Sequence, residues 1–194
     1  MLTNLARAWG SKIVQPIARF LSRLGLTPNG ATLLGFIMTV GVAALIALGH
    51  LRLGGMLLVF TLAFDAVDGT LARLTDTVTR FGAVLDSTLD RWAEIALYAA
   101  LVWHYSQTGL VYGVWLATAA MATSLMVSYT RARAEGAGFA IKEGVFTRLE
   151  RLIVLIAGLI LDLTVWALLL IAVLAAFTAV QRLWVVRQMD RATR

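Results

Sequence analysis

The sequence predicts an all-α integral membrane protein in which six transmembrane helices follow an N-terminal amphipathic helix. Two observations support this fold class. The 194 residues are 60% hydrophobic and only 14% charged, with a mean hydropathy of +0.82, which is too apolar for an ordinary water-soluble domain. Apolar residues also run almost continuously from about residue 31. These runs are long enough to supply several of the roughly 20-residue helices that cross a bilayer.

Six apolar stretches are candidates for the membrane-spanning helices. They are residues 31–49, 54–72, 83–104, 109–130, 149–163 and 165–186. The fifth is the shortest. Because the chain has only two prolines, each stretch can form a helix that satisfies its own backbone hydrogen bonds, as lipid requires. We therefore expect residues 25–194 to form one transmembrane domain, with no separate soluble domain.

The first 24 residues differ from the rest of the chain. Apolar side chains from Leu2 to Leu24 approximate one helical face, and basic residues such as Arg7 and Lys12 are interspersed. Neither the compact apolar stretch nor the cleavage site of a secretory signal is clear. We predict an amphipathic helix over residues 1–24 that lies in the membrane surface, with a frayed polar terminus as the alternative.

The distribution of positive charge predicts the orientation. If residue 1 is inside, only Arg52 of the seventeen Lys and Arg residues falls on the outer side. This asymmetry predicts cytoplasmic N and C termini in the cell membrane. The net charge of +6 suits an anionic inner leaflet, and no aromatic-basic motif for nucleic acid is visible. With zero cysteines, disulfides and thiolate metal sites are excluded.

Four acidic residues stand at helical spacings in this apolar chain. Asp65 and Asp68 are three residues apart, and Asp86 and Asp90 are four apart, so on helices each pair projects from one face. A short connection around residues 75–81 folds the two helices antiparallel and lets the pairs converge. Packed carboxylates repel unless protons or cations lie among them, and hard oxygen ligands favour Mg²⁺ or Mn²⁺. The alternative is a set of helix salt bridges without metal.

Small and basic residues surround these acids. Gly69, Ala72 and Gly82 let a substrate or a neighbouring helix come close. Arg73 supplies a positive charge that can bind phosphate in a forked geometry.

This stretch resembles the signature of the CDP-alcohol phosphotransferase family, D-x-x-D-G-x-x-A-R, eight residues, G-x-x-x-D-x-x-x-D. All fixed positions match, at Asp65, Asp68, Gly69, Ala72, Arg73, Gly82, Asp86 and Asp90. The resemblance implies a six-helix membrane core, homodimerisation, and transfer from a CDP-linked lipid to an alcohol with release of CMP.

The resemblance also implies roles for individual residues. The four aspartates match the metal-site acids, and Asp90 matches the proposed general base. Positions that contact the CDP portion of the donor are matched by Asn29, Gly30, Ala31, Thr32, Gly69, Arg73 and Thr79. The Thr-Pro-Asn-x-x-Thr stretch around Asn29 is equally explained by helix capping.

The expected chemistry is a direct in-line attack. Two divalent ions, Mg²⁺ or else Mn²⁺, could neutralise the pyrophosphate and stabilise the charge that leaves with CMP. Asp90 could accept the proton of the acceptor hydroxyl, and we expect it to be the most weakly metal-bound of the four acids. No Ser, Cys or His constellation indicates a covalent intermediate.

Arginines near the predicted inner surface indicate a phosphorylated acceptor. The segment from Ser128 to Glu135 and the elements around Arg151 and Arg182 resemble those of the phosphatidylinositol phosphate synthases of actinobacteria. Those enzymes join inositol 1-phosphate to CDP-diacylglycerol. By this match, the acceptor phosphate would be held by Arg131, Arg133, Arg151 and Arg182. The alternative for any one arginine is positive-inside decoration that contacts anionic lipids.

Three other functions stay open. Glycerol 3-phosphate could be the acceptor, which would give phosphatidylglycerophosphate. An archaeal-type ether lipid could replace diacylglycerol in the donor. Intramembrane acids could instead mark a cation transporter, although no second copy of the acidic pattern indicates internal repeats.

Overall fold

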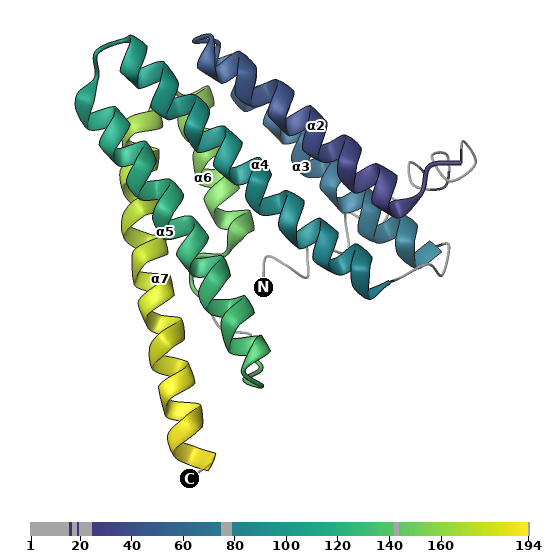
Figure 1. The fold of residues 1–194 in the computed structure, drawn as a ribbon. Coiled ribbons are helices and arrows are strands. Elements are labelled where there is room, and N and C mark those ends of the chain that lie inside the picture. The colour runs from purple at the N-terminus through teal and green to yellow at the C-terminus, as the bar shows by residue number, and fades with distance from the viewer. Residues whose placement is uncertain (1–15, 17–18, 20–24, 75–78, 142–143, 194) are drawn as a thin grey trace. The chain divides into compact units, whose positions relative to one another are not determined.

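The computed structural model describes residues 16, 19, 25–74, 79–141 and 144–193, except the side chains of residues 66–69, 72, 73 and 193. The described chain contains six helices (Figure 1). They are α2 (Pro28–Ala47), α3 (Leu51–Leu74), α4 (Arg80–Gln107), α5 (Val111–Gly136), α6 (Arg148–Ile160) and α7 (Thr164–Thr193). Each predicted apolar stretch lies on one of these helices, give or take a few residues at its ends. The all-α prediction is therefore confirmed for the described part of the chain.

The predicted amphipathic helix lies outside the described residues, apart from Pro16 and Arg19. Both of these are helical and exposed. The helix as a whole, and its place in the membrane surface, stay predictions.

The described helices identify a membrane protein. Three are long and apolar enough to cross a bilayer: Pro28–Ala47, Val111–Gly136 and Thr164–Ala192. Large apolar side chains also face outward, with Leu48, Trp115 and Trp166 exposed by 74%, 70% and 69%. A soluble monomer rarely exposes so much apolar surface.

The other three helices depart from an ideal span in different ways. At 24 and 28 residues, α3 and α4 are long enough, but charged residues interrupt their apolar sequence. The 13 residues of α6 extend only about 20 Å, less than a hydrocarbon core of roughly 30 Å.

The helices are divided between two compact units. The first contains Met1–Ala44 and Met56–Leu97, and therefore most of α2, most of α3 and the first part of α4. In it, Ala31 and Leu71 are buried against each other, with Leu26 and Phe64 packed around them. The second unit contains Leu45–Gly55 and Tyr98–Arg194.

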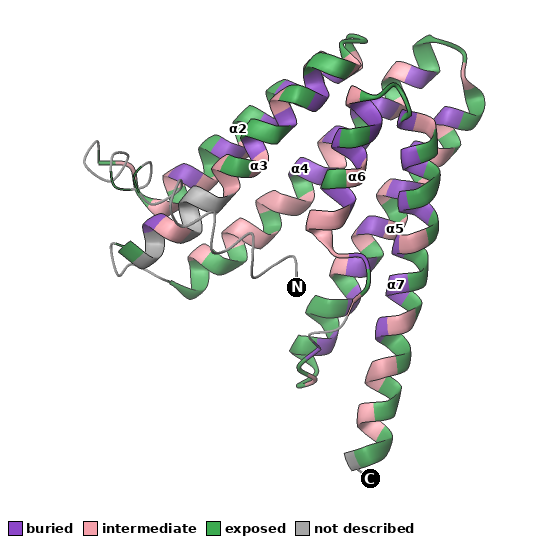
Figure 2. Cartoon of the chain, turned by 180° about the vertical axis from the view of Figure 1, so that it is seen from behind, coloured by how far each residue is buried: buried purple, intermediate pink, exposed green. Residues whose placement is uncertain are grey.

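In the second unit, α7 packs along both α5 and α6 (Figure 1). Buried positions recur at intervals of three and four residues along one side of α5, as Figure 2 shows. They are Gly113, Ala117, Ala120, Ser124, Val127, Thr130 and Ala134. Most are small, so the backbones of α5 and its neighbour can approach closely.

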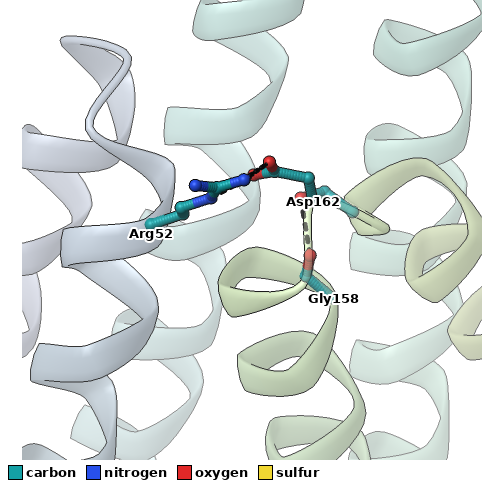
Figure 3. Close-up of polar contacts among 4 residues, drawn as sticks. Arg52, Gly158 and Asp162 are labelled. Atoms are coloured by element: carbon teal, nitrogen blue, oxygen red, sulfur yellow. Dashed lines mark hydrogen bonds and ion pairs between the residues drawn. The ribbon is translucent and has the colours of Figure 1, made fainter.

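The start of α3 is tied to the turn between α6 and α7 (Figure 3). Arg52 forms a two-pronged ion pair with Asp162, in which its Nε donates to Oδ1 at 3.0 Å. Asp162 has a φ of 57°, a left-handed conformation that aspartate tolerates better than most residues. Since both side chains are more than half exposed, at 66% and 53%, the pair adds little stability by itself.

The hairpin of α6 and α7 depends on Gly158. A Cβ at this position would collide with the Cβ of Ala167 and would lie 3.4 Å from the carbonyl oxygen of Leu163. The carbonyl of Gly158 also accepts a hydrogen bond of 3.2 Å from the Thr164 hydroxyl (Figure 3). Glycine therefore allows the closest approach of the two helices.

We expect Gly158→Ala to destabilise the protein by about 1–3 kcal/mol, because the neighbouring atoms belong to packed backbone and a buried methyl group. The measurement is the thermal unfolding midpoint of the purified protein in detergent. Gly41→Ala is the matched control, since Gly41 is also helical but has nothing within 4 Å of the added Cβ. Equal midpoints for the two variants would contradict the tight contact.

Candidate active site

The four predicted aspartates lie on two consecutive helices of the first unit. Asp65 and Asp68 are near the end of α3, and Asp86 and Asp90 are near the start of α4. Five residues separate the two helices, which places the end of one near the start of the next. The helical spacing predicted for both pairs is therefore confirmed.

The described carboxylates are only partly accessible. Asp65, Asp86 and Asp90 are all half-buried, and the side chain of Asp90 is 18% exposed. The described side chains include no group of three acids or histidines placed to hold a metal. The side chain of Asp68, the fourth predicted ligand, is outside the described set, as are those of Gly69, Ala72 and Arg73. The donor set nevertheless consists of carboxylate oxygens, which suits a hard divalent cation.

Both acidic helices approach α2 at glycines. A Cβ on Gly35 of α2 would lie 3.2 Å from Oδ1 of Asp65 on α3. A Cβ on Gly82 of α4 would lie 3.0 Å from Oδ1 of Asn29 on α2. The prediction that Gly82 permits the close approach of a neighbouring helix is confirmed. The helix α2 thus contacts the segments that carry both aspartate pairs.

The starts of α2 and α4 are capped by threonines. Thr79 Oγ1 accepts a 2.9 Å hydrogen bond from the N–H of Gly82, and Thr27 Oγ1 accepts one of 3.1 Å from Gly30. The capping explanation for the Thr-Pro-Asn-x-x-Thr stretch is confirmed at Thr27. Thr32 is its second threonine, and its hydroxyl donates to the carbonyl of Pro28 at 3.1 Å.

The contact between Asn29 and Gly82 brings these two helix starts together. Asn29 is in the first turn of α2, and Gly82 is in the first turn of α4. Helix N-termini present unpaired N–H groups and the positive end of the helix dipole. Two adjacent N-termini therefore form an environment that favours phosphate.

Two charged neighbours of Asp90 were not predicted as site residues. Arg91 Nη1 lies 3.8 Å from Asp90 Oδ2 and donates to the carbonyl of Ser87 at 2.5 Å. Glu94 is only 4% exposed and continues the face of Asp86 and Asp90 by one more helical turn. Its four-residue spacing from Asp90 could have identified Glu94 from the sequence, whereas the position of Arg91 requires the structure.

The second unit gathers three of the four predicted arginines. Arg151 on α6 and Arg182 on α7 are 1% and 4% exposed, and Arg131 on α5 is exposed at the edge of the group. Arg131 and Arg151 lie close enough for their charges to repel that of Arg182. We call Arg131, Arg151 and Arg182 the arginine cluster. Arg133 is exposed in the last turn of α5.

Protein oxygens satisfy part of the arginine cluster. Arg182 Nη1 donates to the carbonyl of Val127 on α5 at 2.5 Å. Arg151 Nη1 is 3.4 Å from the carbonyl of Phe146, and Arg131 Nε donates to Glu135 at 2.8 Å. Simple surface decoration is wrong for Arg151 and Arg182, because both are buried.

Comparisons with known proteins identify the family of this chain. The sequence model of the CDP-alcohol phosphatidyltransferase family matches residues 25–187. The chain is 40% identical over 188 residues to the phosphatidylinositol phosphate synthase of Corynebacterium glutamicum, covering 88% of this chain and 82% of that protein. It is 39% identical over 198 residues to the synthase of Mycobacteroides abscessus, covering 94% and 87%.

Solved structures show the same relationship. The phosphatidylinositol phosphate synthase of Mycobacterium tuberculosis with CDP-DAG bound has a TM-score of 0.82 and 36% identity, covering 90% of this chain and 94% of that one. The same synthase in complex with manganese and citrate also has a TM-score of 0.82, covering 89% and 88%. A cation transporter is therefore excluded as the alternative. The chain belongs to the CDP-alcohol phosphatidyltransferase family and is a phosphotransferase enzyme of this divalent-metal-dependent group.

Proposed function

We propose that this enzyme transfers a phosphatidyl group from CDP-diacylglycerol to a hydroxyl of inositol 1-phosphate, giving phosphatidylinositol phosphate and CMP. The observation that carries the choice of a phosphorylated acceptor is the arginine cluster, in which two guanidinium groups are buried beside a third. The choice of inositol 1-phosphate among phosphorylated alcohols is supported by the relatives named phosphatidylinositol phosphate synthase. Guanidinium groups that lie together offer positive charge and N–H donors whose geometry suits a phosphate. A phosphomonoester supplies two negative charges, whereas free inositol supplies none.

The donor's pyrophosphate belongs, in this proposal, at the paired starts of α2 and α4. The adjacent N-termini there favour phosphate oxygens. The CDP portion would be bound by Asn29, Gly30, Ala31, Thr32, Gly69, Arg73 and Thr79. The Thr79 and Thr32 hydroxyls also make helix bonds, so their contribution to binding would come from the helix ends that they stabilise.

The four aspartates are the proposed metal ligands. Asp65, Asp68, Asp86 and Asp90 offer carboxylate oxygens of the type that Mg²⁺ prefers, with Mn²⁺ as the alternative, and their number suits two ions. When bound, such ions neutralise the pyrophosphate and stabilise the charge that leaves with CMP.

Asp90 is the proposed general base. It would accept the proton as the acceptor oxygen attacks the lipid-proximal phosphorus, while the bond from that phosphorus to the CMP oxygen breaks. Arg91, held to the carbonyl of Ser87, lies 3.8 Å from Asp90 and is a charged neighbour of the proposed base.

We also propose the placement of the chain in the membrane. The six described helices would form the transmembrane core, in which α6 covers only about 20 Å of the hydrocarbon thickness. Residues 1–24 would form the amphipathic surface helix, and residues 25–194 would form the catalytic domain. The basic ends and the active site would face the cytoplasm, because Arg52 alone falls on the other side. The exposed apolar side chains would contact lipid. In the expected homodimer, some of them would contact a second copy of the chain.

The proposed function is tested by CMP release from purified protein supplied with CDP-diacylglycerol and Mg²⁺. Inositol 1-phosphate, free inositol and glycerol 3-phosphate are offered in parallel, and each is repeated with an ether-linked donor. We expect release with inositol 1-phosphate and the diacyl donor. Release with glycerol 3-phosphate alone would identify a phosphatidylglycerophosphate synthase, and preference for the ether donor would overturn the donor assignment.

Asp90→Asn should lower the turnover number by about 10²- to 10⁴-fold, the usual contribution of a general base, while CDP-lipid binding stays largely intact. Turnover and the dissociation constant of CDP-diacylglycerol are measured together. Asp162→Asn is the control, because it makes the same chemical change in the turn between α6 and α7 at a residue outside the proposed site. Full turnover in Asp90→Asn would remove Asp90 as the base.

Arg151→Ala and Arg182→Ala should each raise the KM for inositol 1-phosphate by about 10- to 100-fold, since a hydrogen bond to a charged group is lost. The KM for CDP-diacylglycerol should change much less. Arg187→Ala, an exposed arginine on α7, is the matched control. Equal losses for both substrates would indicate structural damage and would count against the acceptor role.

A further inference from the structure

Gly144, in the connection between α5 and α6, lies directly against the guanidinium of Arg182. A Cβ on Gly144 would be 2.7 Å from Arg182 Nη2, 3.1 Å from Nε and 3.3 Å from Cζ. All three atoms belong to the planar end of the side chain. No side chain at position 144 fits while Arg182 stays where it is.

Space, and not backbone conformation, requires glycine at this position. The glycines with positive φ in the described chain are Gly25, Gly49, Gly109 and Gly138. Gly144 is not one of them, so its backbone is open to any L-residue. The missing side chain is therefore explained by the guanidinium beside it.

A hydrogen bond to another helix also fixes the Arg182 guanidinium. Its Nη1 donates to the carbonyl of Val127 on α5, and the residue as a whole is 4% exposed. The guanidinium thus donates to a helix carbonyl through Nη1 and lies against Gly144 at Nη2 and Nε. The charges of Arg131, Arg151 and Glu135 also act on it.

We propose that Gly144 is a positioning residue that seats the Arg182 guanidinium for binding the acceptor's phosphate. This inference rests on the proposed acceptor role of the arginine cluster. A larger residue at position 144 displaces the guanidinium from this position but leaves the helices in place. Only the flexible end of one side chain has to shift, so the cost falls on binding more than on folding.

The test is Gly144→Ala in the full-length protein, with Gly136→Ala as the matched control. Gly136 precedes the same connection, and nothing lies within 4 Å of its added Cβ. We expect Gly144→Ala to raise the KM for inositol 1-phosphate by about 10-fold, because displacement by a fraction of an ångström weakens an oriented contact. The KM for CDP-diacylglycerol and the thermal midpoint should change little. An unchanged acceptor KM would overturn the proposal.

Repeating Gly144→Ala in the Arg182→Lys variant separates the positioning role of Gly144 from a merely structural role. In Arg182→Lys the planar guanidinium is absent, so adding Gly144→Ala should have little further effect on the acceptor KM. The same 10-fold loss in both backgrounds would show that Gly144 does not act through Arg182, and would overturn the proposal.

A phosphate-binding measurement, which needs no turnover, distinguishes failure of this inference from failure of the proposed function. Thermal stabilisation by inorganic phosphate reports the anion site whichever alcohol is the true acceptor. If the wild-type enzyme does not use inositol 1-phosphate, a loss of phosphate stabilisation in Gly144→Ala, but not in Gly136→Ala, still supports the positioning role of Gly144. Equal stabilisation of Gly144→Ala, Gly136→Ala and wild type would overturn it.

Discussion

The cost of placing charge among apolar helices is the constraint on which this structure depends. An ionised side chain that leaves water loses several kcal/mol of solvation unless protein groups or a ligand replace it. Arg182 and Arg151 are almost fully buried. They donate hydrogen bonds to the backbone carbonyls of Val127 and Phe146, respectively. Asp65, Asp86 and Asp90 keep only partial access to solvent. In the proposed function, these are the positions where a bound phosphate or divalent cation offsets that cost.

Glycines let the backbone come close to polar side chains of the proposed site, two of which are charged. Gly35 faces the Asp65 carboxylate, Gly82 faces the Asn29 amide, and Gly144 faces the Arg182 guanidinium. At each position a Cβ would come within 3.2 Å of a side-chain oxygen or nitrogen. The same chain also uses Gly158 to bring α6 against α7, with no polar group of the site involved. Small residues therefore serve two purposes: helix packing in one place and access to charged side chains in another.

The sequence alone predicts the helices well because apolar length and helical spacing are local properties. Each apolar stretch lies on a helix, and Asp86 and Asp90 share a face of α4 as their spacing requires. It cannot predict which arginines are buried, because burial depends on segments far apart in the chain. Arg131 and Arg151 are both arginines near the predicted inner surface, yet Arg131 is exposed and Arg151 is buried, with 1% of its surface accessible. The contact of Gly144 with Arg182 joins different parts of the chain, so no local pattern signals it.

The charges of the arginine cluster also constrain what the proposed acceptor site can recognise. Arg131 is paired with Glu135, and Arg151 and Arg182 are the two buried positive charges of the cluster. Two such charges match the phosphate dianion, a group that inositol 1-phosphate and glycerol 3-phosphate share. In this proposal the cluster selects phosphorylated alcohols over free ones. Selection between the two alcohols must then come from groups that contact hydroxyls, and it can change independently of phosphate binding.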